Sequence, residues 1–201
     1  FSVILTGDPQ IGASGRKSDK DANDMSVAQD AYNWNKTMQK AMEIDPDASF
    51  LLSAGDQINE SNAESEETKK TRESEYAGYL YPSVFRSLPI AATIGNHDKD
   101  GSDYTAHFNN PNSEDNLGST GAGCDFYFNN GNVLFISLNS NNRNQAEHRE
   151  LMKKAIESNN TDEIKAKTEA LKQASYKMAE EMYKQQGAAG AQPGAAAGAA
   201  G

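Results

Sequence analysis

The sequence is poor in cysteine and in positive charge, and each shortage excludes a class of protein. Cys124 is the single cysteine among 201 residues. An internal disulfide framework and a cysteine-rich metal site are therefore excluded. Lysine and arginine number 19 against 29 aspartate and glutamate residues, which gives a formal net charge of -10. Because this charge repels a polyanionic backbone, we expect no binding of DNA or RNA through a basic face.

Long hydrophobic runs are also missing. No stretch approaches the roughly 18 to 20 consecutive apolar residues that a bilayer-spanning helix needs, so we expect no membrane span. The chain opens directly on an apolar run at residues 2–6, and we expect any signal peptide to lie upstream of it.

The first 140 residues alternate between two kinds of segment. Short apolar runs at 2–6, 49–53 and 89–93 are bounded by turn residues, which is typical of buried strands in a mostly parallel sheet. The intervening segments 26–43 and 69–87 carry apolar residues at helical spacing. The order is therefore β-α-β-α-β, which predicts an α/β fold.

A hairpin is predicted after these elements. Residues 125–130 and 132–139 flank the dipeptide Asn130-Gly131, which is a strong signal for a tight turn between antiparallel strands. The preceding loop, 98–123, is long and polar, so we expect it to form a wall of a functional site.

Each predicted parallel strand runs into a polar cluster that begins with glycine. These clusters are Gly7-Asp8-Pro9-Gln10, Gly55-Asp56-Gln57-Ile58-Asn59 and Gly95-Asn96-His97-Asp98. Ligands of open α/β sheets bind beyond the carboxyl ends of the strands, so the three clusters should face one crevice. Carboxylate and amide oxygens would converge there and suit hard or borderline divalent cations. The candidate metal ligands are Asp8, Gln10, Asp56 and Asn96.

With these clusters the sequence resembles the calcineurin-like metallophosphoesterases, and in particular their purple-acid-phosphatase-like bacterial branch. The resemblance covers about residues 1–159 and includes the segments FYFNNGNVLFISLNSNN and AEHRELMKKAIESN. It implies a sandwich built from a mixed sheet with flanking helices, of which this segment would be a truncated part. It also implies a metal-dependent hydrolase of phosphoesters and a secreted or cell-surface location.

The resemblance further implies a site with two divalent metal ions, either Fe, Mn or Zn. Asp56 would bridge the two ions, while Asp8 would bind the first ion and Asn96 the second. Gln10 would be an additional ligand. Two bridged ions can clamp a phosphoryl oxygen and acidify a bound water.

Two residues of the third cluster would be catalytic by the same resemblance. His97 would contact the phosphate or protonate the leaving group, and Asp98 would orient its imidazole. Asn59 would contact the substrate together with His97. A loop histidine without a function remains the alternative interpretation of His97.

The sequence departs from the family pattern in three respects. Gln10 occupies a position where many relatives have a metal-binding histidine, and Asn59 occupies the position of the tyrosinate that colours the purple enzymes. The family takes further ligands from downstream histidines, but neither His107 nor His148 has the sequence context of those ligands. We expect His148 on a solvated helix face and an incomplete metal shell that impairs activity.

The C-terminal residues have a different character. Residues 160–186 resemble the C-terminal lid helix of the seventy-kilodalton heat-shock chaperones, and the Gly/Ala-rich residues 187–201 predict a disordered tail. We expect a chimera in which the truncated domain 1–159 exposes a sheet face, through which the chain could self-associate. The stripe that could cover this face consists of Ile164, Leu171, Met178 and Met182.

Two functions remain open at this point. The first is a metal-dependent phosphoester hydrolase, and the second is a non-catalytic binding or interaction module made from a phosphoesterase half and a chaperone lid fragment. The metal content of the purified chain distinguishes them.

Overall fold

The computed structural model describes residues 1–15, 20–158, 169, 172–173 and 175–178. The chain divides into two compact units, residues 1–156 and 157–201. The architecture below is that of the first unit. The tail predicted at 187–201 and most of the helix predicted at 160–186 lie outside the described residues.

Three short strands form a parallel sheet, as the apolar runs predict. Strands β1 (Ile4–Thr6), β2 (Leu51–Ser53) and β3 (Ile90–Ala92) lie in the order β1-β2-β3, with β2 in the centre. Ile4 pairs with Leu51, and Leu51 pairs with Ile90, so the three carboxyl ends lie level at one edge of the sheet. This alignment brings the three polar clusters to the same edge.

The two crossover helices differ in their bounds from the prediction. Helix α1 (Lys20–Ile44) begins six residues earlier than expected, and α2 (Glu66–Tyr79) is shorter than expected at its C-terminal end. A capping box at Ser65 fixes the start of α2. Pro82 lies three residues after Tyr79, the last residue of α2, and cannot continue the helix. The chain forms the 3-10 helix η1 (Ser83–Arg86) instead.

The predicted hairpin is confirmed. Strands β4 (Phe126–Asn130) and β5 (Val133–Ser137) pair antiparallel, and Gly131 in the turn has a φ of 60°. They form a sheet of their own rather than extending the parallel one. The hairpin is followed by helix α4 (Gln145–Ser158).

The long loop before the hairpin carries two short helices. These are α3 (Asp103–His107) and the 3-10 helix η2 (Ser113–Asp115). The end of the loop returns to its start. The backbone N–H of Ala122 donates at 3.2 Å to the carbonyl of Lys99, the residue that directly follows the third polar cluster.

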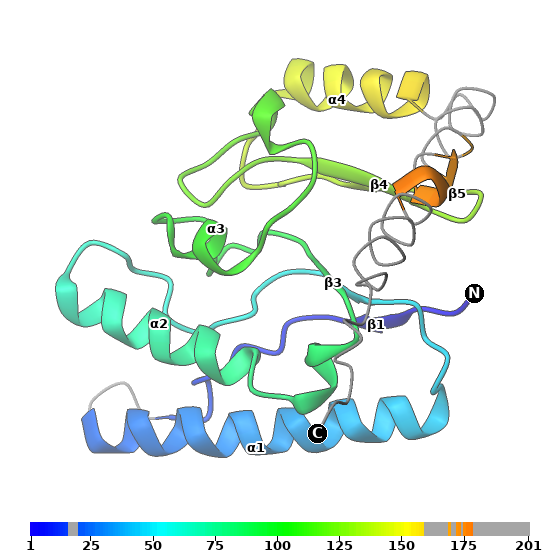
Figure 1. Cartoon of the computed structure of the whole chain (residues 1–201). Helices are drawn as coiled ribbons and strands as arrows, with labels where there is room; N and C mark the ends of the chain where they lie inside the picture. The colour runs from blue at the N-terminus through cyan, green and yellow to red at the C-terminus, as the bar shows by residue number, and fades with distance from the viewer. Residues whose placement is uncertain (16–19, 159–168, 170–171, 174, 179–201) are drawn as a thin grey trace, which may run out of the picture. The chain divides into compact units, whose positions relative to one another are not determined.

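Helices α1 and α2 lie on one side of the parallel sheet and the hairpin lies on the other (Figure 1), and alternate residues of the strands belong to two different cores. On one face, side chains from α1 and α2 pack on the sheet in the main core. On the other face, the hairpin packs through a smaller aromatic core around Phe50, Ala91 and Phe126. The fold is therefore the predicted α/β class, a sheet flanked by helices. The residues that form the main core include Trp34, Met38, Leu51, Tyr76, Tyr79 and Ala92.

Among the described residues, no helix combines the length and the apolar character needed to cross a bilayer.

Candidate functional site

The first two polar clusters continue the pairing of β1 and β2 beyond the strand ends. The backbone N–H of Asp8 donates to the carbonyl of Gly55 at 3.3 Å, and that of Gln10 donates to the carbonyl of Asp56 at 2.9 Å. The Gln10 side-chain amide reaches the Asp56 carboxylate, with 3.4 Å between Nε2 and Oδ2. Three of the four candidate metal ligands therefore lie on adjoining backbone segments.

These three residues have left-handed backbone conformations. The φ angles are 58° for Asp8, 38° for Gln10 and 51° for Asp56. This region costs an L-residue about 1 to 2 kcal/mol. Such strain persists where the surrounding structure over-determines it, and it is concentrated at functional sites.

The third cluster wraps around the Asp56 carboxylate. The backbone N–H of His97 donates to Asp56 Oδ1 at 2.9 Å. A Cβ atom on Gly95 would lie 2.0 Å from the same oxygen, and one on Gly55 would lie 2.8 Å from the Gly95 Cα. Only glycine at both positions allows this approach. Asn96 is exposed and lies between the two residues that touch the carboxylate, so the structure brings all three clusters together.

The imidazole of His97 is oriented by a backbone carbonyl. Its Nδ1 lies 2.5 Å from the carbonyl oxygen of Asn59. A carbonyl only accepts, so we assign the proton to Nδ1, which leaves Nε2 as the free ring nitrogen. The backbone N–H of Asn59 in turn donates to Glu75 Oε2 at 3.0 Å.

Asp98 does not orient the imidazole, contrary to expectation. Its side chain is fully buried, with Oδ1 accepting from the Tyr76 hydroxyl at 2.9 Å and Oδ2 accepting from the backbone N–H of Gly95 at 2.9 Å. Burial raises the pKa of the Asp98 carboxyl to about 6. Asp98 closes the turn that carries Asn96 and His97. Its carboxylate accepts from the backbone N–H of Gly95 and from Tyr76 instead of from the His97 imidazole.

Helix α2 supplies two buried charged residues that the sequence analysis missed. Glu75 Oε2 accepts from the backbone N–H groups of both Asn59 and Glu60, and burial raises the pKa of its carboxyl to about 7. Arg72 is fully buried and holds the second and third clusters together. Its guanidinium pairs with the Asp103 carboxylate and donates to the carbonyls of Glu60, His97, Asp98 and Asp100.

The signal for these residues was present in the helix period. Residues 72, 75, 76 and 79 are spaced so that they share one helix face, and Tyr76 and Tyr79 mark that face as the buried one. Such a helix leads from one polar cluster to the next. Charged residues on its buried face are therefore expected to hydrogen-bond to the loops that form the site.

The two remaining histidines have structural partners. The His148 side chain is 14% exposed and not on a solvated face as expected. Its Nδ1 lies 2.5 Å from Asp125 Oδ2 and its Nε2 lies 2.9 Å from the carbonyl oxygen of Asn142. The imidazole of His107 stacks on Tyr76, with 4.8 Å between ring centroids.

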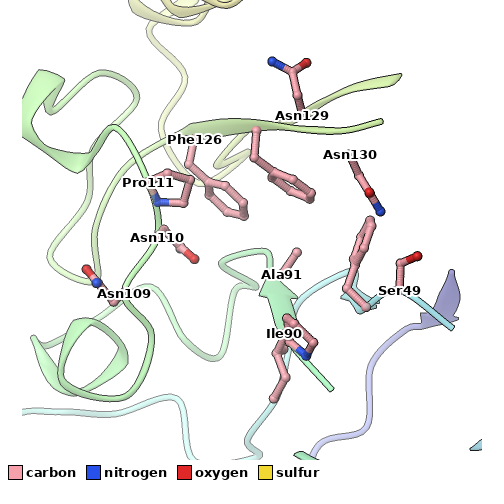
Figure 2. Close-up of a pocket in the computed structure, with 12 residues that line it drawn as sticks. Ser49, Ile90, Ala91, Asn109, Asn110, Pro111, Phe126, Asn129 and Asn130 are labelled. Carbon is pink, nitrogen blue, oxygen red and sulfur yellow. The ribbon is translucent and has the colours of Figure 1, made fainter. Parts of the chain in front are cut away.

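A cavity of about 370 Å³ between the two sheets does not belong to this site (Figure 2). Ser49, Ile90 and Asn110 are among its lining residues. Ser49 precedes β2 and Ile90 begins β3, so the cavity lies at the amino ends of the strands, whereas the polar clusters follow the carboxyl ends.

The donor chemistry of the three clusters fits divalent cations. Two carboxylates and two amides offer oxygen ligands, and Asp8 and Asn96 are exposed to incoming ions. Within the described part of the chain, no group of three or more His, Cys, Asp and Glu residues forms a metal site. The amides of Gln10 and Asn96 would therefore have to complete the ligand set.

Comparison with known proteins assigns the chain to a class. The family model for calcineurin-like phosphoesterases matches residues 1–186. The class is that of the metal-dependent phosphoesterases, hydrolases that in general use divalent metal ions. The chain belongs to the calcineurin-like phosphoesterase family. No solved structure matches it.

Proposed function

We propose that the protein hydrolyses phosphoesters at a dinuclear metal site formed by the three polar clusters. Asp56 would bridge the two ions, with Asp8 and Gln10 on the first and Asn96 on the second. The observation that carries this proposal is the enclosure of the Asp56 carboxylate by both other clusters, through Gln10 Nε2 and the His97 N–H.

Divalent ions bound there would polarise the phosphoryl group and lower the pKa of a bound water. Asn96 adds a ligand oxygen without adding a third negative charge that Asp8 and Asp56 would repel. Because Nδ1 of His97 faces a carbonyl, the free Nε2 can contact the phosphate or carry a proton to the leaving group. Oxygen donors favour Mn²⁺ among the expected metals.

We infer that the protein belongs to the purple-acid-phosphatase-like branch of the family but lacks the colour of its ferric enzymes. Asn59 cannot supply a tyrosinate ligand, and its observed role is to fix the His97 imidazole through its backbone carbonyl. We also infer a reduced turnover, because Gln10 replaces a histidine ligand with a weaker amide oxygen.

The first prediction concerns the bridging carboxylate. The substitution Asp56→Asn removes one negative charge from between two dications, and we expect it to abolish hydrolysis of an aryl phosphate and to reduce bound Mn²⁺. Activity is measured by release of the phenolate, and metal by elemental analysis after dialysis. The matched control is Asp47→Asn, the same change at an exposed residue before β2.

The control variant should keep the activity and the metal content of the unmodified chain. About two ions per chain support the dinuclear site. A chain that binds no Mn²⁺ and hydrolyses nothing would instead be the non-catalytic module, and unchanged turnover in Asp56→Asn would remove the site from this loop.

A further inference from the structure

An asparagine after strand β5 reaches the base of the candidate site. The side-chain amide of Asn141 donates to the carbonyl of Ile94 at 3.2 Å and to the carbonyl of Gly95 at 3.1 Å. These two carbonyls lie between β3 and the turn of Asn96 and His97. Asn141 thus binds the backbone where the third cluster leaves the sheet.

Asn141 is itself held by a buried neighbour. Asn139 Oδ1 accepts from the backbone N–H of Asn141 at 3.2 Å and from its side-chain amide at 3.0 Å. The Asn139 side chain donates to the carbonyl of Gly118 and to Thr120 Oγ1, both at 3.1 Å. Asn139 is 2% exposed, so its orientation is fixed by these partners.

The network ends at a buried carboxylate and a histidine on α4. The backbone N–H of Asn139 donates to Asp125 Oδ1 at 2.6 Å, and Asp125 Oδ2 contacts His148. A Cβ atom on Gly118 would lie 2.3 Å from an Asp125 oxygen, so the long loop closes tightly over this pair. A continuous chain of hydrogen bonds therefore connects α4 with the turn of the third cluster.

We propose that Asn141 is a positioning residue for the turn that carries Asn96 and His97. It would act through this turn, and its catalytic consequence rests on the proposed function. Loss of its amide leaves the Ile94 and Gly95 carbonyls without these donors, and the turn can then shift. A shift moves the His97 N–H relative to Asp56, and a misplacement of about 1 Å can cost about 100-fold in rate.

Hydrogen exchange tests the proposal in the full-length chain without any need for activity. Asn141→Ser removes both donors, and we expect the backbone amides of Gly95 and His97 to exchange about tenfold faster, as the loss of one or two hydrogen bonds predicts. The matched control is Asn142→Ser, because the Asn142 amide contacts Ser119 and Glu147 and not the turn.

Kinetics give a second readout that a merely structural role would not move. In Asn141→Ser we expect kcat for an aryl phosphate with Mn²⁺ to fall about 10- to 100-fold while KM changes little, because a small shift of the turn misplaces groups that act in the transition state more than it weakens substrate binding. Asn142→Ser should keep both values. Equal exchange and equal kcat in the two variants would overturn the proposal.

The unmodified chain supplies a test that holds even if a variant fails to fold. The Asn141 side-chain amide should exchange about tenfold or more slowly than that of Asn129, whose residue is exposed. Equal exchange of the two side chains overturns the proposal. If the unmodified chain hydrolyses nothing but the exchange differences appear, the proposed function fails while the positioning role stands.

Discussion

Asp8, Gln10 and Asp56 each carry a side chain that the candidate site needs on a backbone that glycine would adopt more cheaply. The sequence therefore sacrifices stability at these positions to place oxygen atoms beyond the strand ends. Stability and metal affinity should respond in opposite directions to the same substitution.

We predict this opposition for Gln10→Gly. Relief of the left-handed backbone should raise the free energy of unfolding by about 1 kcal/mol, while loss of the amide weakens Mn²⁺ binding. Urea unfolding without metal measures the first effect, and isothermal titration with Mn²⁺ measures the second.

The matched control is Asn116→Gly, an exposed residue in the long loop with a φ of 50°. It should gain stability without a change in Mn²⁺ affinity. A destabilised Gln10→Gly chain would show that the side chain of Gln10 contributes more to the fold than its backbone strain costs.

At the scale of elements, the sequence predicted the strands and their polar ends better than it predicted the supports behind them. The apolar runs located the five strands of the described residues, because strands that pack on a core through one face or both are rich in apolar residues. Arg72 was not predicted, although the helix period places it on the buried face of α2. Asn141 was not predicted because its partners are backbone carbonyls of another element, and nothing in the local sequence encodes such contacts. The predicted C-terminal end of α2 was several residues too late, because Pro82 disfavours a helical conformation of the residue before it.

Helix α4 is connected to Asp125, the residue that precedes β4, by a contact whose strength depends on pH. Hydrogen bonds to Asp125 and to the carbonyl of Asn142 raise the pKa of His148 above 6.5. Its stabilising contribution is complete below pH 6.5 and is lost as the pH rises through the folded-state pKa. Glu75, with a pKa near 7, acts in the same direction between about pH 4.5 and 7.

We therefore predict that the chain loses stability as the pH rises from 6.5 through the folded-state pKa of His148, and that His148→Gln removes this part of the pH dependence. Near pH 6 the substitution should cost about 2 kcal/mol, the value of a hydrogen bond to a charged group. Urea unfolding of both chains at a series of pH values measures the pH dependence of the free energy of unfolding and the cost of the substitution. A His148→Gln chain that loses as much stability above pH 6.5 as the unmodified chain would assign the dependence to another group.

At the scale of the whole molecule, the parallel sheet has an edge at which the described residues provide no further strand. Strand β1 is the outer strand, and Leu5 on it is 71% exposed. Beside it on the hairpin, Val133, Ile136 and Leu138 are each more than one third exposed. An edge strand with apolar side chains favours pairing with another chain, and we propose a second copy of this protein as the partner.

We predict that the chain is a dimer at about 100 μM and that Leu5→Lys makes it a monomer, because the added charge cannot be buried at a strand–strand contact. Light scattering after size-exclusion chromatography measures the mass. The control Ile44→Lys changes an equally exposed apolar residue at the end of α1 and should remain dimeric. A monomeric unmodified chain would contradict this prediction.

The predicted boundary at residue 159 and the resemblance of residues 160–186 to a chaperone lid helix stay predictions. Most of these residues lie outside the described part of the chain, and the family match extends to residue 186.

The long-range bonds around Asp56 also determine when the site can form. The contacts of Asp56 with His97 and Gln10 span 41 and 46 positions of the sequence, and that of Asn141 with Gly95 spans 46. Contacts of such separation carry a large loop-closure entropy and form late in folding. A bound ion that needs all three clusters would then be absent from the folding transition state, so it would slow unfolding without accelerating folding. The metal would thus raise the kinetic stability of the folded chain and leave its rate of folding unchanged.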